Sequence, residues 1–145
     1  MLNVLQKKYP GAHAWSFGDS PDMANALAEL VVKGIKTATS CAYSEYVQEG
    51  RPFSVGDYHI ILDGNETPVC VIRVIRHTLF TFDSVGKDFA YKEGEGDRSL
   101  AYWREEHRRF FESMEITNSA GESASAFSPT MEILGEEFVV VEQLS

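Results

Sequence analysis

The chain has 145 residues, of which 43% are hydrophobic and 24% are charged. This length and composition are typical of one compact domain, and they exclude a disordered chain, a collagen-like repeat and a coiled coil. Thirteen Lys and Arg residues against 22 Asp and Glu residues give a net charge of −9. Because an acidic chain repels the phosphates of long nucleic acids, only a local basic cleft would hold them.

The amino terminus, the cysteines and the histidines argue against several further classes of protein and site. No stretch approaches about 18 consecutive apolar residues, and residues 1–15 lack the apolar segment of a secretory signal. We therefore expect a cytoplasmic protein with no membrane partner. Cys41 and Cys70 form no CxxC pair, and the four histidines lie far apart, so the sequence predicts no disulfide scaffold, no metal site and no cofactor.

The first strong structural signal is a helix start at Ser20, Pro21 and Asp22. Ser can cap a helix, Pro suits the first helical position, and Asp complements the helix dipole. Apolar residues follow at helical spacing until Gly34 ends the pattern. The pattern predicts a helix over residues 21–33.

Two apolar, β-branched segments follow, at residues 58–62 and 69–76, with turn residues at 63–66 between them. This pattern predicts a β-hairpin. The second arm is apolar on both faces over most of its length, which favours a closed barrel or a sheet covered by helices.

Two further helices are expected in the second half of the chain. Asp83 or Ser84 can cap a short helix through Phe89, and Asp97 or Ser99 can cap a longer one. The longer helix carries these residues at helical spacing: Leu100, Trp103, His107, Phe110 or Phe111, and Met114.

Near the end of the chain, a polar segment is followed by an apolar one. Residues 117–130 are small and polar, so they are interpreted as a mobile surface loop that could act as a lid. Residues 137–142 return to strand composition and are expected to complete the sheet. The element order predicts an α+β fold in a single domain, 1–145.

The first candidate for chemistry is the segment 34–40, which holds Lys36, Thr39 and Ser40 directly after the first helix. A lysine near a hydroxyl acts as a general base if burial favours its neutral form, and the hydroxyl then becomes a nucleophile. The alternative interpretation is a solvated lysine at a helix end, with threonines that fill a strand.

The second candidate is the segment 89–99, in which two glycines allow close backbone approach to a ligand. Glu93, Glu95 and Asp97 offer groups for acid, base or hydrogen-bond chemistry. The alternative interpretation is a solvated acidic loop with a helix cap. The motifs of dinucleotide-binding, P-loop, α/β-hydrolase and zincin enzymes are absent.

Four motifs in order resemble the ASCH domain family, and the resemblance spans residues 15–141. They are WSFGDSP at 15–21, GIKTAT at 34–39, FSVGD at 53–57, and FA at 89–90 followed by EG at 93–94. The family is similar in fold to the PUA RNA-binding domain. The resemblance therefore implies a small PUA-like β-barrel flanked by helices.

The resemblance also implies a function, because some small family members are amidohydrolases that remove an acyl group from N4-acetylcytidine. Their catalytic residues correspond here to Lys36, Thr39 and Glu93. Thr39 would attack the amide carbonyl, neutral Lys36 would take its proton, and Glu93 would hold the lysine. We expect Glu93 rather than Glu95 in this role, since only one carboxylate is expected to face the lysine.

Substrate binding is expected to involve aromatic side chains and neighbours of the catalytic residues. Trp15, Phe17 or Tyr91 could stack on a base, with core packing as the alternative for Trp15 and Phe17. Ser40 adjoins Thr39, and Arg98 could meet a phosphate or a carboxylate, although an arginine there is more often solvated.

The expected partner is a nucleoside or a short single-stranded RNA. The alternatives are a non-catalytic RNA-binding module and a ribonuclease, which other family members resemble. The family often carries a basic residue where Cys41 stands here, which argues against phosphate contact. The net charge of −9 favours the small neutral substrate as well.

Overall fold

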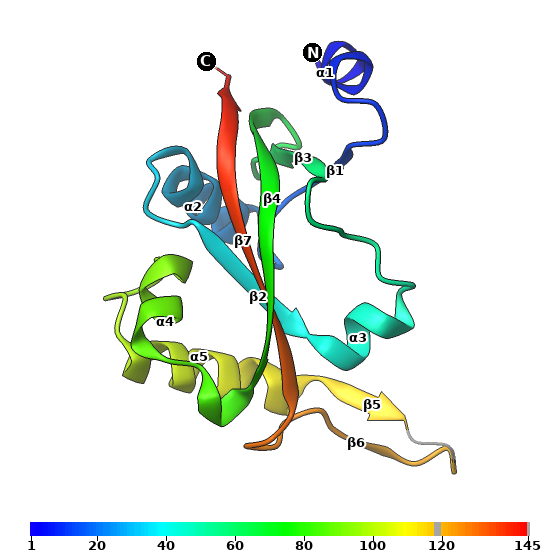
Figure 1. The fold of residues 1–145 in the computed structure, drawn as a ribbon, viewed down its shortest axis with the longest axis vertical. Helices are drawn as coiled ribbons and strands as arrows, with labels where there is room; N and C mark the ends of the chain where they lie inside the picture. Colours follow the sequence, from blue (N-terminus) through cyan, green and yellow to red (C-terminus); the bar gives the residue numbers. More distant parts are fainter. Residues whose placement is uncertain (118–119, 145) are drawn as a thin grey trace.

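The computed structural model describes residues 1–117 and 120–144. Its helices are α1 (Leu2–Lys8), α2 (Pro21–Val32), α3 (Tyr43–Gln48), α4 (Lys87–Glu93) and α5 (Leu100–Ser113), with a 3-10 turn at Phe82–Ser84. Its strands are β1 (His13–Trp15), β2 (Ala38–Ala42), β3 (Tyr58–Leu62), β4 (Pro68–Thr81), β5 (Glu115–Thr117), β6 (Ser123–Ser125) and β7 (Glu132–Gln143) (Figure 1). Within the described ranges, no helix has the length and apolar character needed to cross a membrane.

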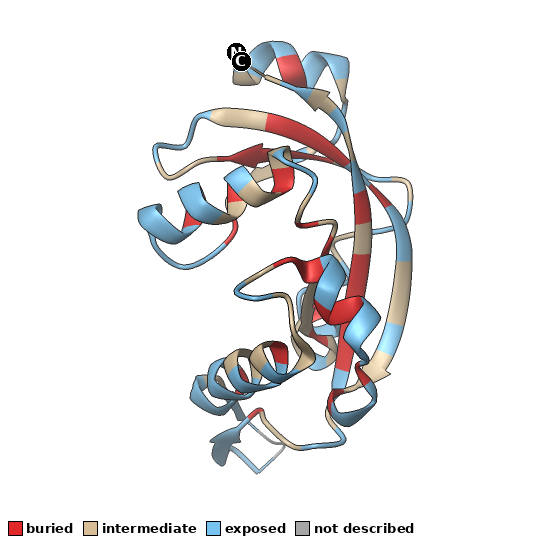
Figure 2. Ribbon diagram, turned by 90° about the vertical axis from the view of Figure 1, so that its left-hand side faces the viewer, coloured by how far each residue is buried: buried red, intermediate tan, exposed pale blue. Residues whose placement is uncertain are grey.

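Five strands form one curled sheet in the order β1-β3-β4-β7-β2. β1 runs parallel to β3, and the other neighbours are antiparallel. Figure 2 shows the long strands bending along one side of the molecule, with α2 and α5 on the inner side of the curve. The fold is therefore α+β, as expected, and the sheet is a half-barrel whose edges are β1 and β2.

The upper part of the sheet is buried on both faces. Ile60 and Val71 pack with Leu5 of α1, whereas their chain neighbours Ile61 and Ile72 join the cluster under α2. Successive strand residues point to opposite faces, so each face must be apolar where helices cover both. This packing explains the two-faced apolar pattern of the second hairpin arm.

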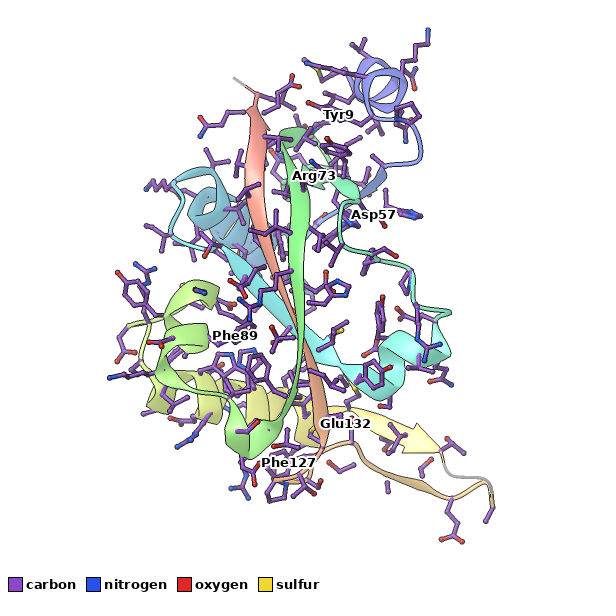
Figure 3. All side chains as sticks on the ribbon, viewed as in Figure 1. Tyr9, Asp57, Arg73, Phe89, Phe127 and Glu132 are labelled. Atoms are coloured by element: carbon purple, nitrogen blue, oxygen red, sulfur yellow. The ribbon has the colours of Figure 1, made fainter. Side chains whose placement is uncertain are left out.

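A third cluster of buried side chains lies between the sheet and the helices α4 and α5. Phe89 reaches from α4 toward the sheet (Figure 3). A methyl group added to Gly135 of β7 would lie 2.7 Å from the Phe89 ring, so only glycine allows this approach. The close packing of α4 on β7 fixes the position of the helix end that carries Glu93.

Several predicted elements are confirmed. The helix expected at 21–33 is α2, and the Ser20 hydroxyl accepts a hydrogen bond from the Met23 amide at 3.1 Å. The hairpin expected at 58–62 and 69–76 is formed by β3 and β4. The strands β4 and β7 are both longer than predicted, because β4 continues to Thr81 and β7 begins at Glu132.

The prediction that Asp83 or Ser84 caps the short helix is wrong. Asp83 and Ser84 lie in the 3-10 turn, where the Asp83 carboxylate and the Ser84 hydroxyl both bond to Thr81, and α4 begins after Gly86. These side chains therefore stabilise a tight turn at the end of β4 instead of starting the helix. The longer helix is capped by Ser99, whose hydroxyl accepts from the Tyr102 amide at 3.0 Å.

The segment 117–130, expected to be a mobile surface loop, contains a short strand and a buried residue. β6 pairs with β5 in a small hairpin, Ala126 is buried, and the Phe127 ring lies 5.0 Å from the Phe82 ring. Residues 118–119 of the expected loop lie outside the described residues. The mobility of the segment stays a prediction.

Replacing Gly94 with alanine should destabilise the fold. Gly94 ends α4 with φ 74°, and an added Cβ would lie 2.5 Å from the carbonyl oxygen of Ile35. We expect G94A to lower the free energy of unfolding by about 1–3 kcal/mol, measured by urea denaturation. G86A is the matched control, because its position has open space and φ −101°. Equal stability of the two variants would contradict the prediction.

Candidate functional site

The segment after α2 carries Lys36 into the interior. The amide of Lys36 donates to the Leu30 carbonyl at 3.0 Å, and the amide of Thr37 donates to the Lys92 carbonyl at 2.7 Å. These bonds join the end of α2 to the end of α4. As a result, the Lys36 side chain is 1% exposed and lies beside Glu93.

The Lys36 amine meets three oxygen acceptors. Its Nζ lies 2.9 Å from Oε2 of Glu95, 3.3 Å from the carbonyl oxygen of Glu93 and 3.5 Å from Oε1 of Glu93. The Phe17 ring adds a cation–π contact at 5.5 Å. An ammonium has three N–H donors and no acceptor, so this set of partners matches the charged form of Lys36.

Glu93 is a buried carboxylate with a full set of donors. Its Oε2 accepts hydrogen bonds from the Ser40 hydroxyl at 2.7 Å and from the Trp103 indole, and Nε2 of His107 lies 3.3 Å away. Burial alone would raise the pKa of Glu93, but the Lys36 charge, His107 and Trp103 together lower it to about 2. Glu93 is therefore ionised and a weak base.

His107 supplies a second cation to this cluster. Its ring stacks on Trp103 with centroids 4.1 Å apart, and its Nδ1 lies 2.8 Å from the Trp103 carbonyl oxygen. Burial alone would lower the pKa of His107, but the hydrogen bond and charge of Glu93 raise it above its ordinary value. Both ring nitrogens face oxygen atoms, which fits the doubly protonated ring.

A cavity of about 410 Å³ opens next to this ion cluster. Its lining includes polar residues (Lys36, Thr39, Ser40, Glu93, Glu95 and His107) and apolar ones (Phe17, Leu27, Phe110 and Phe111). The three expected catalytic residues thus share one cavity. Cavities of this size hold drug-sized ligands.

The expected substrate-binding residues divide into two groups. Phe17 and Ser40 line the cavity, and Trp15 lines an adjoining one that also contains Thr39. Tyr91 and Arg98 line neither of these cavities.

Arg98 instead contacts backbone carbonyls and an aromatic ring of the protein itself. Its guanidinium donates to the carbonyls of Tyr91 at 3.0 Å and Ile35 at 3.2 Å, and it lies 3.4 Å from the centre of the Tyr91 ring. These bonds tie the loop after α4 to the segment that carries Lys36. Ligand binding by Tyr91 and Arg98 stays a prediction.

Sequence reasoning missed three members of the cluster. It expected only one carboxylate at Lys36, whereas both Glu93 and Glu95 contact the amine. It assigned Trp103 and His107 only to an apolar helix face. The available signal was their spacing of four residues, which puts both on one side of α5, but it does not indicate the carboxylate that they contact.

Comparison with known proteins identifies the fold. A family model for the ASCH domain matches residues 13–142. The chain belongs to the ASCH domain family. The ASCH domain from Lactobacillus crispatus JV V101 has a TM-score of 0.80 and 30% identity to it, over 97% of this chain and 86% of that chain.

Two other solved structures are similar to this ASCH domain. Protein EF3133 from Enterococcus faecalis V583 has a TM-score of 0.78 and 33% identity, over 98% of this chain and 85% of that chain. The hypothetical protein PH0355 shares the fold alone, with a TM-score of 0.56 and 14% identity over 90% of this chain and 99% of that chain. Among curated proteins, no match to this chain is significant.

The stability of the ASCH domain should depend on Glu93 in a pH-dependent way. Because folding lowers the pKa of Glu93 from 4.5 to about 2, its ionised form stabilises the fold above pH 4.5, and this contribution is lost as the pH falls through about 2. We expect E93Q to lower the free energy of unfolding by on the order of 3 kcal/mol at neutral pH. The difference should shrink to less than half by about pH 3.

Urea denaturation of both proteins across this pH range measures the difference. E105Q is the control, because the Glu105 side chain is 74% exposed and should change stability little at any pH. If E93Q lost the same amount of stability at neutral pH and at about pH 3, the result would contradict the stabilising role of the Glu93 charge.

Proposed function

We propose that this ASCH domain binds a nucleoside or a short single-stranded RNA in the cavity and hydrolyses the amide of an N4-acylated cytidine. One observation carries the proposal: Thr39, Ser40 and the buried Lys36 line the same cavity as three phenylalanines, Phe17, Phe110 and Phe111. Such a site offers a nucleophile, a positive charge and a surface for a base.

The charges of the cavity favour a nucleoside over a phosphate. Four carboxylates, those of Asp19, Glu93, Glu95 and Glu106, line it against the two basic residues Lys36 and His107. Both basic side chains are already paired with Glu93. A phosphate would therefore meet excess negative charge, whereas exocyclic amino groups and ring N–H groups would find acceptors.

Each group has a role in the proposed reaction. Thr39 attacks the acyl carbonyl and forms an ester, which water then hydrolyses. The Lys36 ammonium stabilises the negative charge that develops on the carbonyl oxygen. Glu93 holds the ammonium in place, and Phe17 and Phe110 provide apolar contact for the base.

The first test is turnover of N4-acetylcytidine by the purified domain, followed by chromatography of the cytidine released. T39V should reduce kcat by at least about 100-fold, because it removes the nucleophile and keeps the side-chain shape. T37V is the matched control, since Thr37 lies in the same segment but outside this cavity and bonds to the Lys92 carbonyl. Equal turnover by T39V and the unchanged protein would remove Thr39 from the reaction.

Family membership supports a second candidate function, a non-catalytic RNA-binding module or a ribonuclease. The affinity of a protein that holds single-stranded RNA through its phosphates falls with salt, with a logarithmic slope of about 0.7 per phosphate. We expect a nearly salt-independent affinity for N4-acetylcytidine and only weak RNA binding, measured by calorimetry and fluorescence anisotropy.

The amidohydrolase, the RNA-binding module and the ribonuclease give different results in these measurements. Tight RNA binding with a slope of several phosphates, together with no nucleoside binding, would support the binding module. Fragments of the RNA on a denaturing gel would support the ribonuclease instead.

A further inference from the structure

A row of three polar residues runs from the central strand β4 to the edge strand β2. Thr39 of β2 is paired directly with Glu136 of β7, and Glu136 is paired directly with His77 of β4. Directly opposite residues of antiparallel strands point to the same face, with Cβ atoms about 4.5–5.5 Å apart. Thr39, Glu136 and His77 are therefore neighbours on one face of the sheet.

Two members of this row, Thr39 and Glu136, line a second cavity, of about 250 Å³. Thr39, Ser40 and Phe110 line both this cavity and the one beside Lys36. Glu136 lines only the second cavity. Thr39 thus stands where the two cavities meet, with Lys36 in one and Glu136 in the other.

Glu136 differs from Glu93 in its partners. It is 7% exposed, and its carboxylate accepts no hydrogen bond from any residue that the structure describes. The nearest basic group is Nε2 of His77 at 3.9 Å, and that atom is itself buried without a hydrogen-bond partner among the described residues. A buried carboxylate without donors is free to accept a proton.

We propose that Glu136 is the general base that takes the proton of the Thr39 hydroxyl. The assignment rests on the proposed acyl transfer by Thr39, and it gives that reaction a proton acceptor. Neither Lys36 nor Glu93 fits this task. The Lys36 amine already donates to three acceptors, and the Glu93 carboxylate already has four side-chain partners, from Lys36, Ser40, Trp103 and His107.

In the proposed reaction, Glu136 accepts a proton in each of the two steps and passes it on before the step ends. As the Thr39 oxygen bonds to the acyl carbon, its proton moves to the Glu136 carboxylate. The C–N bond then breaks, and the proton passes from Glu136 to the departing amino group of cytidine. Water next attacks the acyl ester and gives a proton to Glu136, and this proton returns to the Thr39 oxygen as the carboxylic acid leaves.

The surroundings of Glu136 suit a base that works near neutral pH. Burial raises the pKa of Glu136 to about 7, and burial lowers the pKa of His77, which is therefore neutral there. The other titratable groups that line this cavity or act on the pair are Cys41 of β2, Glu45, Tyr46 and Glu49 of α3, and Asp57 before β3. A base needs its ionised form, so kcat should rise with pH around 7.

The decisive comparison is E136Q against E137Q in N4-acetylcytidine turnover. E136Q keeps the size of the side chain and removes the base, so kcat should fall by about 100-fold or more with little change in KM. E137Q is the matched control, because Glu137 is the next residue of the strand and pairs instead with Lys92 at 2.8 Å. An equal fall of kcat in E136Q and E137Q would overturn the proposal.

The pH profile of the unchanged protein is a measurement that needs no variant. A rise of kcat centred near pH 7 supports the assignment, and its absence in E136Q links the rise to Glu136. A profile without that rise would overturn the proposal. Circular dichroism of E136Q separates a lost base from a lost fold.

A second probe separates failure of the base from failure of the proposed substrate. p-Nitrophenyl acetate can acetylate Thr39 directly, with p-nitrophenolate as the leaving group, and peptide mass spectrometry locates the acetyl group. Acetylation of Thr39 that becomes about tenfold slower or more in E136Q supports the base even if no nucleoside is hydrolysed. Acetylation of Thr39 at equal rates in both proteins, or none at Thr39, would overturn it.

Discussion

The buried charge of Glu93 is the constraint on which the rest of the site depends. A carboxylate taken out of water costs several kcal/mol unless donors replace its hydration. Here the donors come from β2 through Ser40, from α5 through Trp103 and His107, and from the segment after α2 through Lys36. The charge is stable only when these elements meet, so it fixes the position of α4 and α5 against the sheet edge.

This arrangement also limits what the clustered groups can do. The three N–H donors of Lys36 are matched by three acceptors, and one oxygen of Glu93 is shared by three donors. Groups held in this way keep their charges and exchange protons with difficulty. They are suited to hold a fixed electric field across the cavity, and the proton transfer of the proposed reaction would use a group outside the cluster.

Local sequence signals predicted the elements well, because their causes are local. The cap at Ser20 and the hairpin around residues 63–66 depend on a few neighbouring residues. Periodicity assigned His107 to the apolar side of α5 and gave no sign of its carboxylate partner. The pairing of Thr39 with Glu136 depends on the register of two strands almost a hundred residues apart, which no local pattern determines.

Glu93 and Glu136 show how one residue type acquires opposite properties from its surroundings. Both are buried, yet the pKa of Glu93 is lowered to about 2 by its cationic and hydrogen-bonding neighbours, and that of Glu136 is raised to about 7 by burial alone. Two carboxylates with such separate pKa values can divide the work of a site: one maintains a charge and the other moves a proton. Thr39 lines the cavities of both, and in the proposed reaction its hydroxyl is the group on which the two carboxylates would act together.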